Sequence, residues 1–184
     1  FQDIDMLIQK YNSCLYFKHG HRKLEMFKEH VYIQGYEEAA LYIINRLNDL
    51  SSAGIRNYTT SIDSWLQTST HIVDCDEKKD ALRRLFEKSK VALVYGAAGT
   101  GKSTMINHIS NFFNDKTKLY LANTNPAVDN LRRRVQAGNC SYKTLSKFLS
   151  PKNTDFEYDI LIIDECSTVS NSDMREVLEK AKFK

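Results

Sequence analysis

The stretch "VYGAAGTGKSTMI", Val94 to Ile106, decides the fold, because it gathers three of the seven glycines of this 184-residue chain. Its centre fits the phosphate-binding pattern G-x-x-x-x-G-K-[ST]. Glycine permits positive φ angles and close backbone approach, so successive N–H groups can point at a phosphate. A helix starting at Lys102 adds its N-terminal dipole to the same place. The residues expected to hold the phosphates are Gly96, Ala97, Ala98, Gly99, Thr100, Gly101, Lys102, Ser103 and Thr104.

This loop is predicted to lie between a strand and a helix, the context that the pattern needs. "VALVY" (91–95) is a short apolar run rich in β-branched and aromatic residues, which predicts a strand buried on both faces. "KSTMINHISNFF" (102–113) sets apolar residues at helical spacing and leaves His108 on the polar, exposed side. Lys102 would then reach the β- and γ-phosphates of a nucleotide, and the Ser103 hydroxyl would ligate Mg²⁺.

Two further apolar runs, "KLYLA" (118–122) and "DILII" (159–163), predict buried strands. Asn125 and Pro126 predict a helix start, with asparagine at the cap and proline in the first turn. Strands that alternate with helices indicate a parallel sheet with right-handed crossovers. The predicted fold class is therefore α/β, with a parallel sheet and flanking helices.

Two acids, Asp164 and Glu165, follow the predicted strand at 159–163. Ligands bind at the carboxyl ends of the strands in such sheets. Asp164 is expected to help hold Mg²⁺, directly or through water. Glu165 is expected to orient and deprotonate an attacking water, the role of a general base. Lys102 and Glu165 are thus the candidate catalytic residues.

The signals before the loop are mainly helical. Apolar residues recur at helical spacing in "DIDMLIQKYNSCLYF" (3–17) and "EEAALYIINRLNDL" (37–50). A third helix is expected from Asp74, whose spacing to Glu77 is that of a capping box. The polar stretch 56–70 predicts a loop with one short helix. We expect two parts, a helical N-terminal segment or accessory domain over 1–75 and a nucleotide-binding lobe over 76–184.

The net charge of +3 is unevenly distributed. Eight basic residues against one acidic residue give the segment 116–152 a charge of +7, which leaves −4 for the remainder. Such an excess fits a contact with a phosphate backbone, and equally a solvated face of an ordinary domain. The basic residues are Lys116, Lys118, Arg132, Arg133, Arg134, Lys143, Lys147 and Lys152.

Composition and termini limit the class of protein further. No apolar run approaches the roughly 18 residues of a membrane span, and the first residues lack a signal peptide, so we expect a cytoplasmic protein. The four cysteines match neither a zinc spacing nor a disulfide framework and are expected to be reduced and mostly buried. Because the chain begins at Phe1 without a methionine, we expect a piece of a longer protein.

From about residue 74 to 175 the chain resembles the first motor lobe of superfamily 1 DNA helicases, in particular the RecD-like and UvrD-like groups. "GAAGTGKST" resembles their motif I, "LANTNPAVDNLRRRV" their motif Ia, "SYKTLSKFL" more loosely motif Ib, and "IIDECSTV" motif II. The resemblance implies a RecA-like P-loop NTPase that binds ATP and Mg²⁺. It also implies that Thr124, Asn125 and Thr144 line a track for single-stranded DNA or RNA.

The chain departs from the family pattern in three respects. Lys78 stands near the position of a glutamine that reads adenine in many members, so the nucleotide preference is open. Ser146 stands where motif Ib often has histidine. The lobe is expected to be truncated after motif II, without the second motor lobe and its arginine finger, so that it binds nucleotide with little turnover. Two alternatives are an ATP-dependent switch acting through a protein partner and an AAA-type ATPase.

Overall fold

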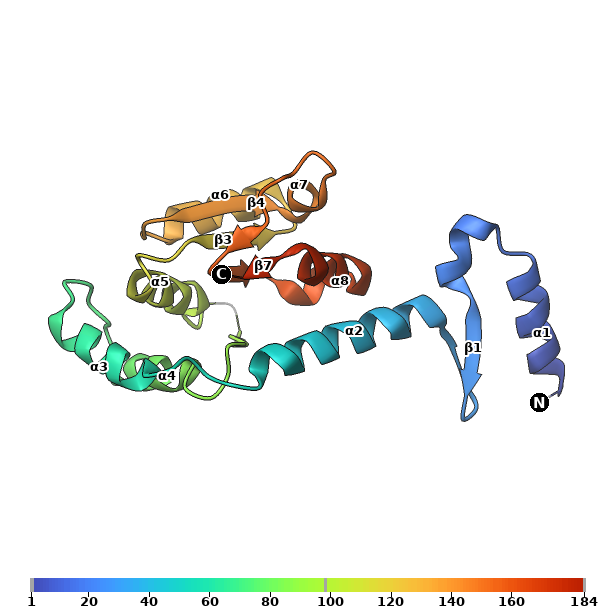
Figure 1. Ribbon diagram of the computed structural model, residues 1–184, viewed down its shortest axis with the longest axis horizontal. Coiled ribbons are helices and arrows are strands. Elements are labelled where there is room, and N and C mark those ends of the chain that lie inside the picture. Colours follow the sequence, from blue (N-terminus) through green and yellow to red (C-terminus); the bar gives the residue numbers. More distant parts are fainter. Residues whose placement is uncertain (1, 98, 184) are drawn as a thin grey trace.

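The computed structural model describes residues 2–97 and 99–183. Its centre is a three-stranded parallel sheet of β3 (Lys118–Ala122), β4 (Cys140–Thr144) and β6 (Ile160–Ile163), in the order β4-β3-β6 (Figure 1). Ala122 pairs with Thr144, and Leu121 pairs with Ile163. The α/β fold with a parallel sheet, predicted from the sequence, is therefore confirmed, as are the strands predicted at 118–122 and 159–163.

Helices cover both faces of this sheet. Side chains of β3 alternate between the two faces, as the pleat of a strand requires. Leu119 and Leu121 pack against α7 (Leu145–Leu149) and α8 (Asn171–Lys180). Tyr120 and Ala122 pack against α6 (Asn125–Arg134). The central strand is consequently buried along its whole length.

A third apolar cluster lies outside the sheet, where α3 (Tyr58–Thr68), α4 (Asp76–Leu85) and α5 (Lys102–Phe112) meet. Ile62 of α3 and Leu82 of α4 are completely buried, and Ile109 of α5 packs with them. This cluster joins helices on both sides of the domain boundary predicted after residue 75. The helix that follows the glycine loop is thus fixed from behind by α3 and α4.

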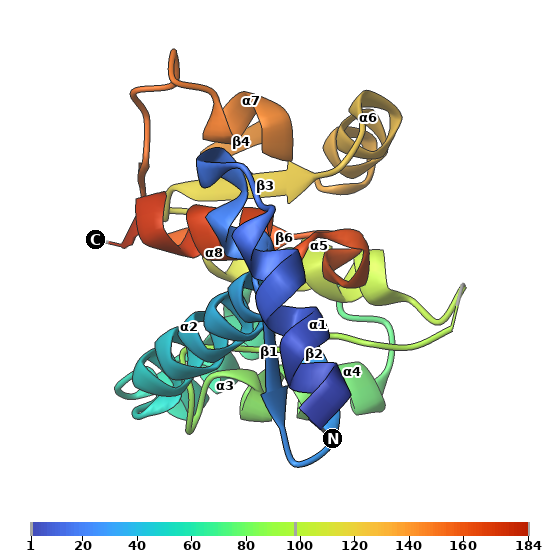
Figure 2. The ribbon, with the colours of Figure 1, turned by 90° about the vertical axis from the view of Figure 1, so that its right-hand side faces the viewer.

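The N-terminal part extends away from the sheet. It consists of α1 (Gln2–Ser13), the 3-10 helix η1 (Phe17–Arg22), the antiparallel pair β1 (Leu24–Phe27) and β2 (His30–Ile33), and α2 (Gln34–Ser51). Helix α2 packs against α8 and leads outward, so that α1 and the hairpin lie far from the sheet (Figure 1). Figure 2 looks from that end of the molecule, with α1 in front of the other elements. None of the described helices has both the length and the apolar character that crossing a bilayer requires.

Short elements complete the fold. The chain after β6 turns through the 3-10 helix η2 (Cys166–Thr168) into α8. The two-residue strands β5 (Glu157–Tyr158) and β7 (Lys182–Phe183) form a separate parallel pair.

The strand predicted at 91–95 is absent from the structure. Residues 91–96 form no ladder with any described strand, and Leu93 and Tyr95 are 74% and 93% exposed. The apolar run at 91–95 indicates that the segment can be buried on both faces. A strand also needs a neighbouring strand with which to exchange hydrogen bonds. Strand β6, the edge of the sheet, has β3 beside it and no second described strand.

Several predicted helix boundaries differ from those observed. Helix α4 begins at Asp76, and its capping position is Cys75, because the Asp74 carboxylate binds the Lys78 ammonium instead of the helix backbone. Helix α6 is capped by Thr124 and not by Asn125, which is its first residue. The stretch predicted as mostly loop at 56–70 contains the full helix α3, and the β1-β2 hairpin was not predicted.

Candidate nucleotide-binding site

Two glycines of the loop have the positive φ angles that the pattern predicts. Gly99 and Gly101 have φ angles of +81° and +85°, in the left-handed region that favours glycine. The first hydrogen bond of α5 runs from the Met105 N–H to the Gly101 carbonyl, at 2.9 Å. The N–H groups before Met105 therefore lie at the open end of the helix, where an anion can accept from them. Ala98, also predicted to hold phosphate, lies outside the described residues.

Lys102 folds back over this loop. Its ammonium donates to the carbonyl oxygens of Gly96 and Ala97, at 2.6 Å and 2.8 Å. The loop itself is closed by bonds from the Thr100 N–H and hydroxyl to the Ala97 carbonyl. Lys102, the predicted phosphate ligand, is thus at the loop, and its ammonium is hydrogen-bonded to two backbone carbonyl oxygens. The ammonium has three N–H donors, so a phosphate that binds here can accept from the third or replace one of these carbonyls.

Ser103, the predicted magnesium ligand, accepts a hydrogen bond from an unexpected partner. The Arg134 Nη1 atom, at the end of α6, lies 3.1 Å from the Ser103 hydroxyl oxygen. The sequence pattern placed Arg134 only in a basic segment. The contact was not predicted because it depends on how α6 packs beside α5, a tertiary feature.

The two predicted acids lie at the carboxyl end of β6. The Asp164 N–H donates to the Leu121 carbonyl of β3 at 2.9 Å, and the Asp164 side chain is half-buried. Glu165 is exposed and has a φ of +50°, a left-handed conformation that is uncommon for a residue with a side chain. Among the described residues, no hydrogen bond or ion pair joins Lys102 or Ser103 to either acid.

The residues predicted to contact nucleic acid lie at the same edge of the sheet. Thr124 follows β3, and Thr144 ends β4, the neighbouring parallel strand. Each threonine hydroxyl caps the next helix, accepting from the N–H of Ala127 at 3.3 Å and of Lys147 at 3.2 Å. Thr124 and Asn125 are exposed, and Thr144 is half-buried. Thr124, Asn125 and Thr144 therefore lie at the carboxyl ends of the parallel strands, where Asp164 also lies.

The basic segment 116–152 does not present all its charges to solvent. Lys118 is 1% exposed and donates to the carbonyls of Phe113 and Lys116, and burial lowers the pKa of its ammonium. Lys143 is half-buried and forms an ion pair with Asp155 at 3.2 Å. The exposed members are Lys116, Arg132, Arg133, Arg134, Lys147 and Lys152.

A polar cluster that the sequence did not predict lies behind the loop. His108 of α5 is 4% exposed, so the prediction that it faces solvent was wrong. Its Nδ1 atom lies 2.7 Å from the Nε2 atom of His71, and burial lowers the pKa of both imidazoles. The His108 Nε2 atom is 3.9 Å from an Asp74 carboxylate oxygen. That carboxylate binds Lys78, whose Cε atom lies 3.7 Å from where a Cβ atom on Gly101 would be.

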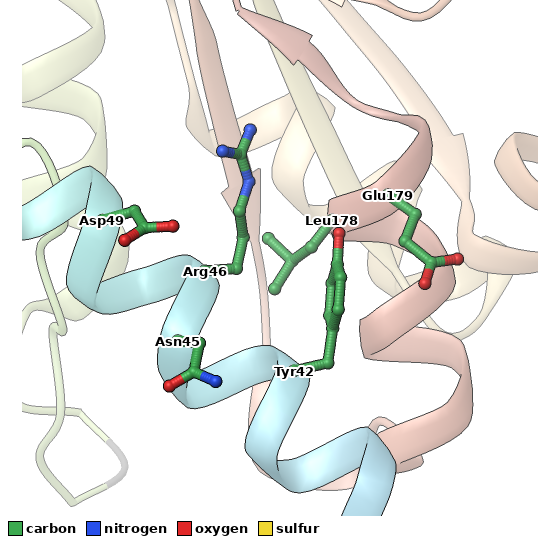
Figure 3. Close-up of a pocket in the computed structure, with 6 residues that line it drawn as sticks. All are labelled: Tyr42, Asn45, Arg46, Asp49, Leu178 and Glu179. Carbon is green, nitrogen blue, oxygen red and sulfur yellow. The ribbon is translucent and has the colours of Figure 1, made fainter.

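Other possible sites offer less. In the described ranges, no group of three or more His, Cys, Asp or Glu side chains could hold a metal ion. The cysteines are not buried as expected, since Cys14 and Cys166 are exposed and Cys75 and Cys140 are half-buried. Figure 3 shows a surface pocket between α2 and α8. None of the residues that line it belongs to the glycine loop. The residues that line it are Tyr42, Asn45, Arg46, Asp49, Leu178 and Glu179.

A G-x-x-x-x-G-K-[ST] loop that opens a helix at Lys102, beside a parallel sheet, is typical of P-loop NTPases, although the strand expected before the loop is not formed by the described residues 91–95. Residues 75–184, more than half of the chain, match the AAA_30 family, an AAA domain found in RecD-like helicases. The chain therefore belongs to this family of P-loop NTPase domains. No match to a curated protein was found.

Proposed function

We propose that the chain is the ATP-binding lobe of a nucleic-acid-dependent ATPase, a DNA helicase or translocase that couples ATP hydrolysis to movement on single-stranded DNA. The observation that carries this proposal is that the candidate residues for hydrolysis and for strand contact lie together at the carboxyl ends of the parallel strands. Asp164 follows β6, Thr124 follows β3 beside it, and Thr144 ends β4 on the other side of β3. Groups for hydrolysis and groups for strand contact thus meet on one rigid element, as coupling of the two requires.

In this proposal the loop binds the phosphates of ATP. The N–H groups at the start of α5 and the Lys102 ammonium supply the donors. Ser103 and Asp164 offer a hydroxyl and a carboxylate oxygen, the donor type that Mg²⁺ prefers. When bound, Mg²⁺ neutralises charge on the β- and γ-phosphates. Glu165, exposed beside Asp164, orients the attacking water and accepts its proton.

Strand contact in this proposal involves Thr124, Asn125 and Thr144, whose neutral side chains can bond to phosphates, sugars or bases. Exposed Arg132 of α6 and Lys147 of α7 add the electrostatic attraction. Residues 1–75 form an accessory segment in front of the lobe at 76–184. Rapid turnover would require an arginine from a second motor lobe, which can raise the rate by about 10³ to 10⁵.

The test is nucleotide binding by this chain, followed by strand-stimulated hydrolysis in a full-length protein that contains it. We expect a fluorescent ATP analogue to bind the chain with Mg²⁺ and the Lys102→Ala variant to lose most of that binding. We also expect single-stranded DNA to stimulate hydrolysis, with a matched RNA as comparison, and high salt to remove the stimulation. Nucleotide binding that is the same in Lys102→Ala would contradict the assigned site.

One observation favours a second candidate, an ATP-dependent switch that acts through a protein partner. Burial of Lys118 and pairing of Lys143 with Asp155 leave less basic surface than the sequence offered. Nucleotide binding combined with hydrolysis that is indifferent to DNA and RNA would support this candidate over the motor.

A further inference from the structure

The contact between Arg134 and Ser103 links two helices of the lobe. The arginine is at the last position of α6, and the serine is at the second position of α5. The Nη1-to-Oγ distance is 3.1 Å, within the range of an N–H···O hydrogen bond. Lys102, one residue before Ser103, closes over the loop from its own helix. Two cationic side chains from different helices therefore meet at one anion-binding loop.

The packing of α6 determines where Arg134 lies. Val128 and Leu131 of this helix are buried against the sheet, at 6% and 2% exposure, which fixes its rotation. Just beyond the helix, the Gln136 N–H donates to the Asn107 side-chain oxygen of α5 at 2.9 Å. The C-terminal end of α6 is thus anchored to α5 by backbone as well as side chain.

The two arginines that precede Arg134 have partners on their own helix. Arg132 pairs with Asp129 at 3.1 Å and lies over the Tyr142 ring. Arg133 donates to the Asn130 side chain at 2.8 Å. Arg134 is the member of the three whose hydrogen bond reaches the glycine-loop helix. Its position, rather than its charge alone, sets it apart.

We propose that Arg134 is a further nucleotide-binding residue, which contacts the terminal phosphate of a bound nucleoside triphosphate. This inference rests on the proposed nucleotide site. A Ser103 hydroxyl that ligates Mg²⁺ is next to the β- and γ-phosphates, so a guanidinium that reaches this hydroxyl is also within reach of those oxygens. Divalent cation and guanidinium repel each other at one hydroxyl. Arg134 therefore exchanges the serine for a phosphate oxygen when the nucleotide binds.

The chemistry of the two acceptors favours this exchange. A hydrogen bond from a guanidinium to an anionic oxygen is roughly twice as strong as one to a neutral hydroxyl. The planar guanidinium can also present two parallel N–H groups to one phosphate, which the ammonium of lysine cannot. Because α6 begins at the predicted strand-contact residues, this phosphate contact would connect nucleotide occupancy to the helix that approaches nucleic acid.

The experiment measures the dissociation constants of a non-hydrolysable fluorescent nucleoside triphosphate and of the matching diphosphate, each with Mg²⁺, on the full 184-residue chain. We expect Arg134→Ala to weaken triphosphate binding by about tenfold and diphosphate binding by clearly less. Arg134→Lys should restore part of the loss. Arg133→Ala is the matched control, one residue away and partnered within α6, and it should bind both nucleotides like the parent chain.

Three outcomes overturn the inference. If the parent chain binds nucleotide, and Arg134→Ala binds the triphosphate and the diphosphate as tightly as the parent does, Arg134 does not contact the phosphate. If the variant binds the triphosphate more tightly, Arg134 blocks the site instead of contributing to it. If the parent binds neither nucleotide, the proposed function fails, and the inference fails with it.

Discussion

Glu165 combines two features at the residue scale. It is exposed at the end of β6, and its φ of +50° places it in the left-handed region, where residues with a Cβ atom are strained. Such strain tends to persist where the surrounding structure holds a residue for a purpose. The Thr168 hydroxyl and N–H both donate to the Glu165 carbonyl at 2.8 Å and so hold this turn.

The assigned role of Glu165 gives the first prediction. Glu165→Gln keeps the size of the side chain but removes its ability to accept a proton from water. We expect nucleotide binding close to that of the parent and hydrolysis lowered by about 10² or more, the usual contribution of a general base. Phosphate release under single-turnover conditions, in a full-length protein that contains this chain, measures this. Glu157→Gln, an exposed glutamate on β5, is the control, and equal loss in both variants would argue against the role.

His108 shows what a single helix pattern leaves out. The spacing in 102–113 assigns it to the polar side of α5, but His71 and Asp74, from the segment between α3 and α4, lie against it and leave it 4% exposed. The local period reports which residues share a face, and it does not report what packs on that face. His71 lies far from His108 in sequence, so their contact could not be predicted from spacing.

The buried pair predicts a dependence of stability on pH. Burial lowers the pKa of His71 and His108, so the unfolded chain binds more protons than the folded chain just below about pH 6.5. The free energy of unfolding should therefore fall as the pH falls through that region, and His108→Gln should reduce the slope. Urea unfolding between about pH 5 and about pH 8 measures it. The exposed His19→Gln is the control, and an equal slope in His108→Gln would refute the assignment.

At the scale of elements, the successful predictions share a cause. The strands at 118–122 and 159–163 are apolar runs, the helix from 102 has apolar residues at helical spacing, and the helix from 125 opens with asparagine and proline. Each has the neighbours that its apolar side chains need. The segment 91–95 has an equally strong pattern but no described ladder partner, and the prediction of a strand there was wrong. The β1-β2 hairpin was missed because its turn residues, Lys28 and Glu29, adopt positive φ angles without glycine or asparagine.

Helix α8 provides a prediction at this scale. The Ser170 hydroxyl accepts from the Asp173 N–H at 3.1 Å and donates to the Asp173 carboxylate at 2.8 Å, a reciprocal cap. Ser170→Ala should lower the free energy of unfolding by about 1 kcal/mol, because the cap satisfies one of the unpaired N–H groups of the first turn. Chemical denaturation measures this change. Ser172→Ala, exposed and two residues away, should have little effect, and equal effects would mean that the cap contributes nothing.

At the scale of the whole molecule, the glycine-loop helix is part of two packed bodies. Its N-terminus carries the loop, its middle contacts α6, and Ile109 belongs to the cluster with α3 and α4. The sequence predicted two parts divided after residue 75, and nothing in local composition indicated that this cluster would join them. A ligand at the loop therefore acts on a helix that also holds part of the N-terminal segment.

Nucleotide binding should consequently protect more than the loop. Ligand at about 100 times its dissociation constant stabilises the folded state by about 2.7 kcal/mol. Hydrogen exchange measured with and without Mg-nucleotide should slow in α3 and α4 as well as in α5. Exchange in α1 and the β1-β2 hairpin, which lie far from the sheet (Figure 1), is the internal control. Protection confined to the loop and α5 would show that the third cluster does not transmit the effect.

The hydrogen bonds from the Lys102 ammonium to the carbonyls of Gly96 and Ala97 also bear on which anions this loop can bind. A lysine ammonium with no hydrogen-bond acceptor at this loop would readily bind sulfate, inorganic phosphate or a carboxylate. Here two of the three N–H groups of the ammonium already have backbone acceptors, so an arriving anion gains less from this lysine than from a free ammonium. A small anion can make few contacts here, whereas a polyphosphate chain can contact the backbone N–H groups of the loop, Lys102 and Ser103 at once. We therefore expect sulfate or inorganic phosphate to compete poorly with a nucleoside triphosphate at this loop.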